Sequence, residues 1–321
     1  MHRATAHAGS TGFSVWLAAT LLATFMISAV GRAETVAGNA RKAVLVTGAG
    51  SGIGRKITER LASHGYLVYA TARNEADLQA LGSIRNVEAL HLDVTQAADI
   101  ESAVDTISRS GRGLYGLVNN AGVATMGSIA DMHLEEYELV MAVNAYGPFR
   151  MIKAFEPLLI AQHGRIVNIG SIAGLLARPR FAAYSMSKRA IEALTDSAAD
   201  ELAPVGVRVS IVEPGAYESD IMKKAISRQH LDANTVRDLE ADTTKGKDPD
   251  EVAAAVEHAL FDANPKRRYL VVPTQRAAEA TIRKQIEQLV QLNEGQPYTY
   301  SGATLVRMLD AALAEQRYQT K

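Results

Sequence analysis

The sequence predicts an α/β fold with a doubly wound parallel sheet, and three observations support that prediction. Short apolar runs alternate with amphipathic stretches from about residue 41 to residue 273. The apolar runs have the length of buried strands, and the stretches between them have helical periodicity. Strands joined by helical crossovers form a parallel sheet with helices on both faces, and we count about seven such strands.

The elements follow one another in a regular order. The first strand is KAVLVT, and the stretch GIGRKITERLASHG predicts a helix that Gly65 ends. The next strands are YLVYATA and VEALHLDV, followed by a helix near residues 97–108. Then come LYGLVNNAG, a long helix around residues 134–161, and RIVNIGS. The domain, residues 40–273, is completed by a helix containing YSMSK, the strand VRVSIVEPG, a helix near residues 250–261 and the strand RYLVVP.

Two more helices form a C-terminal extension over residues 274–321. Each has an apolar face: Ile282, Ile286, Leu289 and Val290 in the first, and Leu305, Met308, Leu309 and Leu313 in the second. Ser301 is a plausible cap for the second helix. We expect these faces to pack on the main domain; the alternatives are a subunit contact or a cover over a substrate cleft.

Composition restricts the kinds of partner. The chain has 321 residues, a formal net charge of −1 and 47% hydrophobic residues, which is typical of a soluble globular protein. Its basic patches, such as residues 266–268, are too short to indicate a nucleic-acid partner. There is no cysteine, which excludes disulfides, thiolate metal ligands and cysteine nucleophiles. We therefore expect a small-molecule substrate, no nucleic acid and no metal.

Residues 1–39 form a separate hydrophobic segment and linker. Residues 13–30 read FSVWLAATLLATFMISAV and carry no charge. A run of about 18 apolar residues is the lower limit for a membrane anchor, and more basic residues follow it than precede it, which would keep the domain on the cytoplasmic side. The alternatives are export after signal cleavage near Ala33, or a true start at Met26.

A glycine-rich turn follows the first strand. The stretch TGAGSGIG places Gly48, Gly52 and Gly54 where the chain enters a helix. Glycines at such a turn let the backbone approach a pyrophosphate, and the free amides of the helix start favour its negative charge. Because a strand precedes the turn and a helix follows it, the sequence predicts a Rossmann-like nucleotide site.

The end of the second strand indicates which nicotinamide cofactor binds. An acidic residue there would bind the 2'-hydroxyl of the adenosine ribose, whereas a basic residue accommodates a 2'-phosphate. This chain has Ala72 followed by Arg73, whose guanidinium can pair with a phosphate. We expect NADP(H) to be preferred over NAD(H); otherwise Arg73 is a solvated loop residue.

An ordered set of motifs resembles the short-chain dehydrogenases/reductases. The motifs are TGAGSGIG, LDV, NNAG, VNAYG, IGSIAG, YSMSK and PGAYES, in the family's order. Ser171 stands 13 residues before Tyr184, as in the family, and the resemblance covers about residues 41–273. It implies an oxidoreductase that interconverts a carbonyl and an alcohol by hydride transfer.

Tyr184 and Lys188 are the central catalytic candidates. Four residues apart on a helix, their side chains would project side by side. A free tyrosine is a poor acid or base near neutrality, and a neighbouring ammonium favours the phenolate and lowers the pKa. Tyr184 would then be the general acid/base. Ser171 would hydrogen-bond the substrate oxygen, and by resemblance Asn144 would hold a water that links Lys188 to solvent.

The resemblance also implies a cofactor cradle. Asp93 and Val94 would border the adenine, Asn119 would line the cofactor and brace the central strands, and Ser219 would bind the carboxamide. Asp93 could instead cap the following helix. The full set of cofactor-binding candidates is Gly48, Ser51, Gly52, Ile53, Gly54, Arg73, Asp93, Val94, Asn119, Ala121, Gly122, Tyr184, Lys188, Pro214, Gly215 and Ser219.

Residues 216–247 would be the variable substrate loop of the family, and their mix of charged and apolar residues suits a mobile lid. The resemblance also implies a homodimer or homotetramer through the two long helices. Two other functions stay open: reduction of a 3-oxoacyl group on a carrier protein, and a non-catalytic NADP-binding sensor or scaffold.

Overall fold

The computed structural model describes residues 41–229 and 246–319, and the side chains as far as residue 315. Seven strands form one parallel sheet in the order β3-β2-β1-β4-β5-β6-β7. Their bounds are β1 (Ala43–Val46), β2 (Leu67–Ala72), β3 (Val87–His91), β4 (Gly116–Asn119), β5 (Arg165–Ile169), β6 (Arg208–Pro214) and β7 (Arg268–Val271). The predicted fold class is confirmed.

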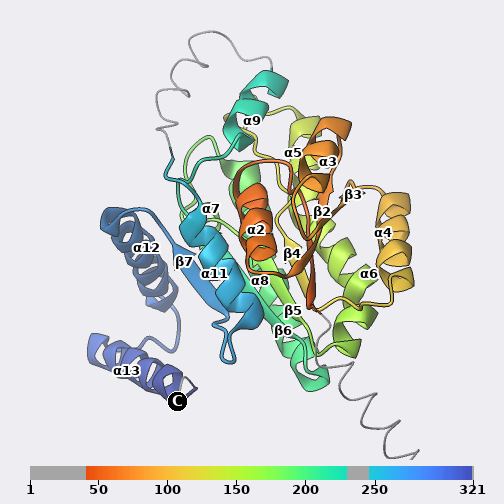
Figure 1. Cartoon of the computed structure of the whole chain (residues 1–321). Helices are drawn as coiled ribbons and strands as arrows, with labels where there is room; N and C mark the ends of the chain where they lie inside the picture. Colours follow the sequence, from red (N-terminus) through yellow and green to blue (C-terminus); the bar gives the residue numbers. More distant parts are fainter. Residues whose placement is uncertain (1–40, 230–245, 320–321) are drawn as a thin grey trace, which may run out of the picture. The chain divides into compact units, whose positions relative to one another are not determined.

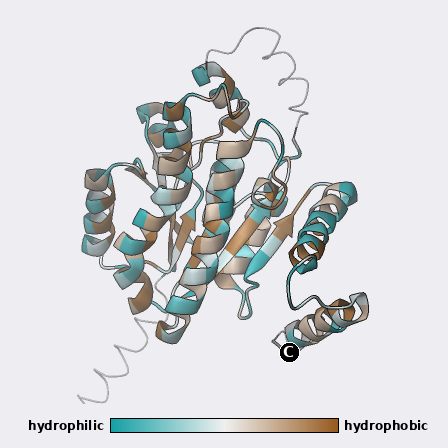
Figure 2. Ribbon diagram, turned by 180° about the vertical axis from the view of Figure 1, so that it is seen from behind, coloured by the Kyte–Doolittle hydropathy of each residue, from teal (hydrophilic) through white to brown (hydrophobic). Residues whose placement is uncertain are grey.

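Helices cover both faces of this sheet (Figure 1). One face carries α2 (Gly52–Ser63), α3 (Glu75–Gly82) and α11 (Asp250–Phe261), and the other carries α4 (Ala97–Arg109), α6 (Gly147–Ala161) and α8 (Ala182–Leu202). Along β1, Ala43 and Leu45 enter one core while Val44 and Val46 enter the other. Burial on both faces explains the apolar stretches of the central strands, which are brown in Figure 2.

The long helix expected around residues 134–161 is interrupted. It consists of α5 (Leu134–Met141), a π-helical turn η1 (Ala142–Tyr146) and α6. Pro148, in the first turn of α6, has no N–H to donate and its ring crowds the carbonyl one turn back, so that a regular α-helix cannot pass through. The wider turn places Asn144 inside the fold, where it is buried.

The two C-terminal helices are present as α12 (Gln275–Asn293) and α13 (Gly302–Gln319). Ser301 Oγ accepts a hydrogen bond from the Thr304 amide, so the predicted cap is present. The expected burial of their apolar faces is wrong: Ile282 is 54% exposed, and the other apolar side chains named above are also exposed except Leu305, which is half-buried. The reason is that α12 turns a different face inward, on which Thr281 is fully buried and the Gln285 amide donates to the Leu175 carbonyl.

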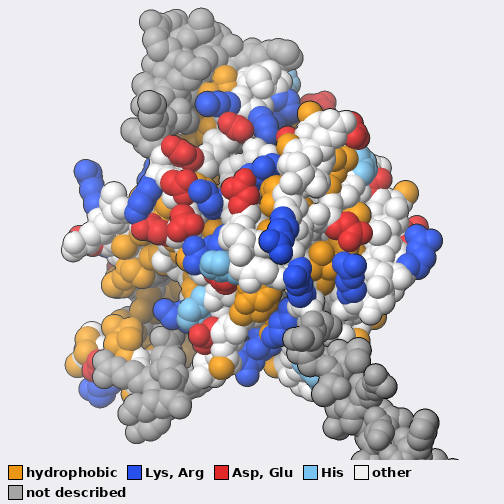
Figure 3. Space-filling model, viewed as in Figure 1, with side chains coloured by type: hydrophobic (Ala, Val, Ile, Leu, Met, Phe, Trp, Pro, Cys, Tyr) orange, Lys and Arg blue, Asp and Glu red, His pale blue; other side chains and the backbone are white. Residues whose placement is uncertain are grey.

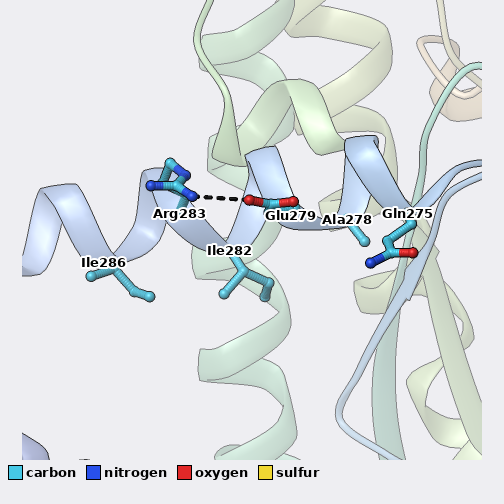
Figure 4. A pocket seen from close by; sticks show the side chains of 6 residues that line it. All are labelled: Gln275, Ala278, Glu279, Ile282, Arg283 and Ile286. Atoms are coloured by element: carbon cyan, nitrogen blue, oxygen red, sulfur yellow. Dashed lines mark hydrogen bonds and ion pairs between the residues drawn. The ribbon is translucent and has the colours of Figure 1, made fainter.

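Hydrophobic side chains therefore gather on the surface of α12 and α13 (Figure 3). On α12 they border a shallow hollow of about 600 Å³, drawn in Figure 4. Its lining residues are Gln275, Ala278, Glu279, Ile282, Arg283 and Ile286. Arg283 donates to Glu279 across 2.9 Å at the edge of this hollow.

Residues 13–30, and with them the anchor and signal interpretations, lie outside the described residues. None of the helices within residues 41–229 and 246–319 has the length and apolar content needed to cross a bilayer. Of the expected substrate loop, the structure describes a short helix, α9 (Ile221–Gln229), while residues 230–245 are outside the described ranges.

Candidate active site

A cleft of about 1290 Å³ lies at the carboxyl ends of the strands. Strand order reverses between β1 and β4, and open α/β sheets bind ligands at that switch point. Candidates from seven separate segments meet here: Gly48, Ser51, Ile53, Arg73, Asp93, Val94, Ala121, Gly122, Ser171, Tyr184, Pro214, Gly215 and Ser219 all line the cleft. The other five candidates, Gly52, Gly54, Asn119, Asn144 and Lys188, are not among the residues that line it. Within the described ranges no group of His, Asp and Glu is arranged to hold a metal.

Two positions of the glycine-rich turn, Gly48 and Gly52, require glycine. Gly48 has φ +65° and Gly52 has φ +57°, a region that side chains other than glycine rarely adopt. A Cβ on Gly48 would lie 2.8 Å from the Cα of Ala121, and one on Gly52 would lie 3.3 Å from the Cα of Ser219. The turn is therefore held close to the loops after β4 and β6.

Asn120 is a residue that the sequence analysis missed. Its amide donates to the carbonyls of Thr47 and Gly48, at 2.9 and 3.0 Å, and so fixes the glycine turn to β4. The second Asn of NNAG was the available signal. Asn119 points away from the cleft and donates to Asn168 Oδ1 at 2.8 Å, which joins β4 to β5. Its bracing role fits the geometry, whereas lining of the cleft does not.

Arg73 and Asp93 lie together at one end of the cleft. Arg73 Nη1 is 3.4 Å from Asp93 Oδ2, and the Arg73 side chain is mostly exposed. Burial would raise the pKa of Asp93, but hydrogen bonds from Thr95 and the charge of Arg73 outweigh it and hold that pKa below its usual value. Asp93 does not cap α4, whose first turn is preceded by Gln96.

Tyr184 and Lys188 lie one turn apart on α8, as the spacing predicted. Lys188 Nζ is 5.7 Å from the centroid of the Tyr184 ring and donates to the Ile169 carbonyl at 2.8 Å. Burial lowers the pKa of Lys188 to about 8, although the charge of Glu192 acts in the opposite direction. An ammonium at Lys188 is therefore present at neutral pH and is lost in mildly alkaline solution.

The expected net lowering of the Tyr184 pKa is wrong for this structure. Burial raises the pKa of Tyr184, because it penalises the phenolate, and a hydrogen bond with Ser171 only partly offsets this. The Lys188 ammonium is engaged by the Ile169 carbonyl. The hydrogen bond with Ser171 favours the phenolate, but it does not reverse the effect of burial.

Ser171 occupies the turn between β5 and a short helix, α7 (Ile172–Leu175). Its Oγ accepts from the Ala173 amide at 3.1 Å, so that it caps α7 and also contacts Tyr184. One position of the Ser171 side chain therefore both caps α7 and contacts Tyr184.

Asn144 is held firmly in the π-helical turn. Its Nδ2 donates to the Val123 carbonyl at 2.8 Å and to Ser187 Oγ at 3.0 Å, while its Oδ1 accepts from the Val123 amide at 2.9 Å. A Cβ on Gly122 would lie 3.5 Å from Asn144 Oδ1 and 3.9 Å from Lys188 Nζ. Gly122 thus leaves free space where the side chains of Asn144 and Lys188 converge.

The helix α9 is anchored at both ends of the cleft. Arg228 forms an ion pair with Glu136 at 2.7 Å and donates to the Ala124 carbonyl at 2.6 Å. At the other end, Lys224 Nζ donates to Ser51 Oγ at 3.2 Å, next to the glycine turn. These partners are far apart in sequence, and the sequence analysis did not find them.

The fold and the cleft together define a class of protein: an NAD(P)-dependent oxidoreductase with a Rossmann-like sheet. The family model described as short chain dehydrogenase matches residues 42–230. The chain belongs to the short-chain dehydrogenase/reductase family, and the resemblance inferred from its motifs is confirmed.

Named relatives fit this assignment. The mitochondrial D-beta-hydroxybutyrate dehydrogenase of Mus musculus is 34% identical, over 71% of this chain and 76% of that protein. The 3-oxoacyl-(acyl-carrier-protein) reductase FabG of Vibrio cholerae is 35% identical, over 73% of this chain and 94% of that protein. The crystal structure of a short-chain dehydrogenase from Streptomyces avermitilis superimposes with a TM-score of 0.68 at 31% identity, over 80% of this chain and 96% of that one.

Proposed function

We propose that this enzyme is an NADP(H)-dependent oxidoreductase that interconverts a carbonyl and an alcohol, with Tyr184 as the general acid/base. The observation that carries the proposal is the placement of Tyr184 on the wall of the same cleft as the glycine turn, with Lys188 one helical turn behind it. Ser171, in contact with Tyr184, completes the group. A site of this kind can protonate an oxygen in the same step in which the adjoining carbon gains a hydride.

The residues of the cleft fit a dinucleotide. A Cβ at Gly48 or Gly52 would meet neighbouring backbone, so glycine is what lets the turn lie this close to the loops after β4 and β6. Ser51 precedes α2 without capping it, which leaves the first amides of that helix free for an anion. Arg73, Asp93, Val94, Ala121, Gly122, Pro214, Gly215 and Ser219 would line the remainder of the cofactor site.

The chain's own residues would then divide the chemistry among them. NADPH supplies the hydride when it is bound. Tyr184 gives its phenolic proton to the substrate oxygen, and Ser171 donates a hydrogen bond to that oxygen as charge develops on it. The Lys188 ammonium stabilises the phenolate that remains. Asn144 would keep a water in the space beside Gly122, so that solvent restores the lost proton.

The experiment that tests this function is an assay of the full-length protein. We expect oxidation of NADPH, followed by its absorbance, with at least one member of a panel of ketones, aldehydes, quinones and 3-oxoacyl thioesters. Heat-denatured protein serves as the control for non-enzymatic oxidation. Binding of NADPH without turnover of any panel member would favour a non-catalytic sensor instead.

We expect Arg73→Gln to raise the KM for NADPH by about tenfold to a hundredfold and to leave the KM for NADH nearly unchanged. The reason is the loss of a charge-assisted hydrogen bond to a 2'-phosphate, a group that NADH does not have. Initial rates with both cofactors measure the effect. Arg178→Gln, which changes another arginine of the cleft, should not alter the ratio. An equal rise for both cofactors would contradict the preference for NADP(H).

A second candidate, reduction of a 3-oxoacyl group on a carrier protein, is suggested by the FabG relative. The thioesters in the panel test it directly.

We also propose a homo-oligomer through the two long helices α6 and α8, because Phe149 on α6 and Met186 on α8 are large apolar side chains left exposed. If residues 13–30 are an anchor, the domain would face the cytoplasm, where an NADP(H) enzyme finds its cofactor.

A further inference from the structure

Three ionisable side chains on α8 and the neighbouring strands have no part in the chemistry proposed above. They are Glu192 on α8, Glu213 on β6 and Arg268 on β7. The side chains of the two glutamates are only 7% and 3% exposed. Arg268 Nη2 is 3.2 Å from Glu192 Oε2, and Arg268 Nε is 3.7 Å from Glu213 Oε1. A single guanidinium therefore faces two buried carboxyl groups.

Each of these carboxyl groups has one oxygen without a hydrogen-bond donor. Among the described residues, Glu192 Oε1 and Glu213 Oε1 are buried and receive no hydrogen bond. Leaving two buried carboxylate oxygens unpaired is costly. The two carboxyl groups are within hydrogen-bonding reach of each other, but such a bond requires a proton on one of them. One shared proton would satisfy both oxygens.

The surroundings indicate which glutamate holds this proton. Burial, and after it the negative charge of Glu192, raise the pKa of Glu213 well above its usual value. Burial also raises the pKa of Glu192, but Arg268 and the hydrogen bond from Glu213 oppose that shift. Glu213 is therefore the acid and Glu192 the carboxylate. Two like charges in contact rarely both ionise, which agrees with this assignment.

The pair adjoins the proposed catalytic residues of α8. Glu192 follows Lys188 by one turn of α8, just as Lys188 follows Tyr184, so the three side chains share a face. Glu213 immediately precedes Pro214 and Gly215, which line the cleft. The pair is thus connected to the site through α8 on one side and through β6 on the other.

We propose that Glu213 and Glu192 share one proton as an acid–carboxylate pair, and that the single negative charge of the pair keeps Lys188 protonated. The pair would be a positioning pair rather than a catalytic one, because it acts on Tyr184 only through Lys188. The inference rests on the roles proposed above for Tyr184 and Lys188.

The other charged groups nearby do not replace the pair. Arg189 and Asp196 lie on α8, Arg268 begins β7, and Arg267 immediately precedes that strand. The charges of Arg189 and Arg268 lower the pKa of both glutamates, and Asp196 forms ion pairs with Arg267 and Arg268. The charge that raises the pKa of Lys188 against burial is that of Glu192. Without it, Lys188 would lose its proton at a lower pH.

The test is an NMR titration of the full-length protein carrying isotope-labelled lysine ε-carbons, with the Lys188 resonance assigned by Lys188→Met. We expect Glu192→Gln to move the Lys188 titration about one pH unit lower, a tenfold change in the protonation equilibrium. Glu213→Gln, which imitates the protonated acid and keeps the charge on Glu192, should move it clearly less. Asp196→Asn, which removes another carboxylate from Arg268, serves as the matched control and should leave it in place.

A second measurement detects the shared proton itself. Infrared difference spectra at neutral pH should contain the carbonyl stretch of a protonated carboxyl group, which is lost in Glu213→Gln and retained in Asp196→Asn. An unchanged Lys188 titration in Glu192→Gln, equal shifts in both glutamate variants, or no such band would overturn the proposal. Neither readout needs turnover, so an inactive but folded protein would count against the proposed function and leave this inference testable.

Discussion

Replacing Tyr184 by Phe should reduce turnover by about 10²–10⁴-fold, the usual contribution of a general acid or base. The substitution removes only the phenolic hydroxyl and keeps the aromatic ring of residue 184, which lies on α8 and lines the cleft. Ser171 and Lys188 keep their partners, the Ala173 amide and the Ile169 carbonyl. The Kd for NADPH should therefore rise only a few-fold. Steady-state rates and a fluorescence titration of cofactor binding measure the two quantities separately.

A matched control is Tyr146→Phe. Tyr146 is an exposed tyrosine in the π-helical turn and lies over Arg150, outside the cleft. Its variant should keep the parent turnover. If Tyr184→Phe also kept it, the proton would have to come from another group, and the proposed mechanism would be wrong.

Replacing Gly54 by Ala should lower the free energy of unfolding by about 1–3 kcal/mol and largely abolish cofactor binding. The new Cβ would lie 2.3 Å from Asn120 Nδ2 and 2.4 Å from the Gly48 carbonyl oxygen. The Asn120 amide could rotate away, but only by giving up its bonds to Thr47 and Gly48. The Gly48 carbonyl is backbone, so the turn itself would have to move.

The matched control for this variant is Gly82→Ala. Gly82 ends α3, and the nearest atom to its added Cβ is the Ala89 Cβ at 3.9 Å, an ordinary contact. Thermal unfolding and NADPH titration should be close to those of the parent. Parent-like unfolding and binding in Gly54→Ala would show that the turn tolerates the displacement, contrary to this prediction.

The parts of this fold that were predictable from the sequence are those decided by local patterns. Apolar runs of strand length and helical periodicity predicted the strands in order and most of the helices, but not α3 or α7. The four-residue spacing of Tyr184 and Lys188 placed them on one helix face, because the pitch of a helix is fixed. The glycine turn was recognisable because positive φ angles select glycine.

The remaining features depend on contacts between distant segments. Nothing local distinguishes Asn119, which faces β5, from Asn120, which holds the glycine turn. The pairing of Arg228 with Glu136 joins residues far apart in sequence. That Glu213 meets Glu192 depends on which face of β6 lies against α8. Burial then reversed the expected direction of the Tyr184 pKa shift, since the sequence does not say how much water reaches a side chain.

One consequence follows from α8, a helix of 21 residues that contains Tyr184, Lys188 and Glu192. Their relative positions are set by backbone hydrogen bonds within a single rigid rod packed on the sheet. Substitutions in α9, a separate element that also lines the cleft, can therefore be made without disturbing the spacing of the reactive groups. Substrate access and the chemical step can therefore be engineered separately in this enzyme: α9 can be redesigned while α8 is left unchanged.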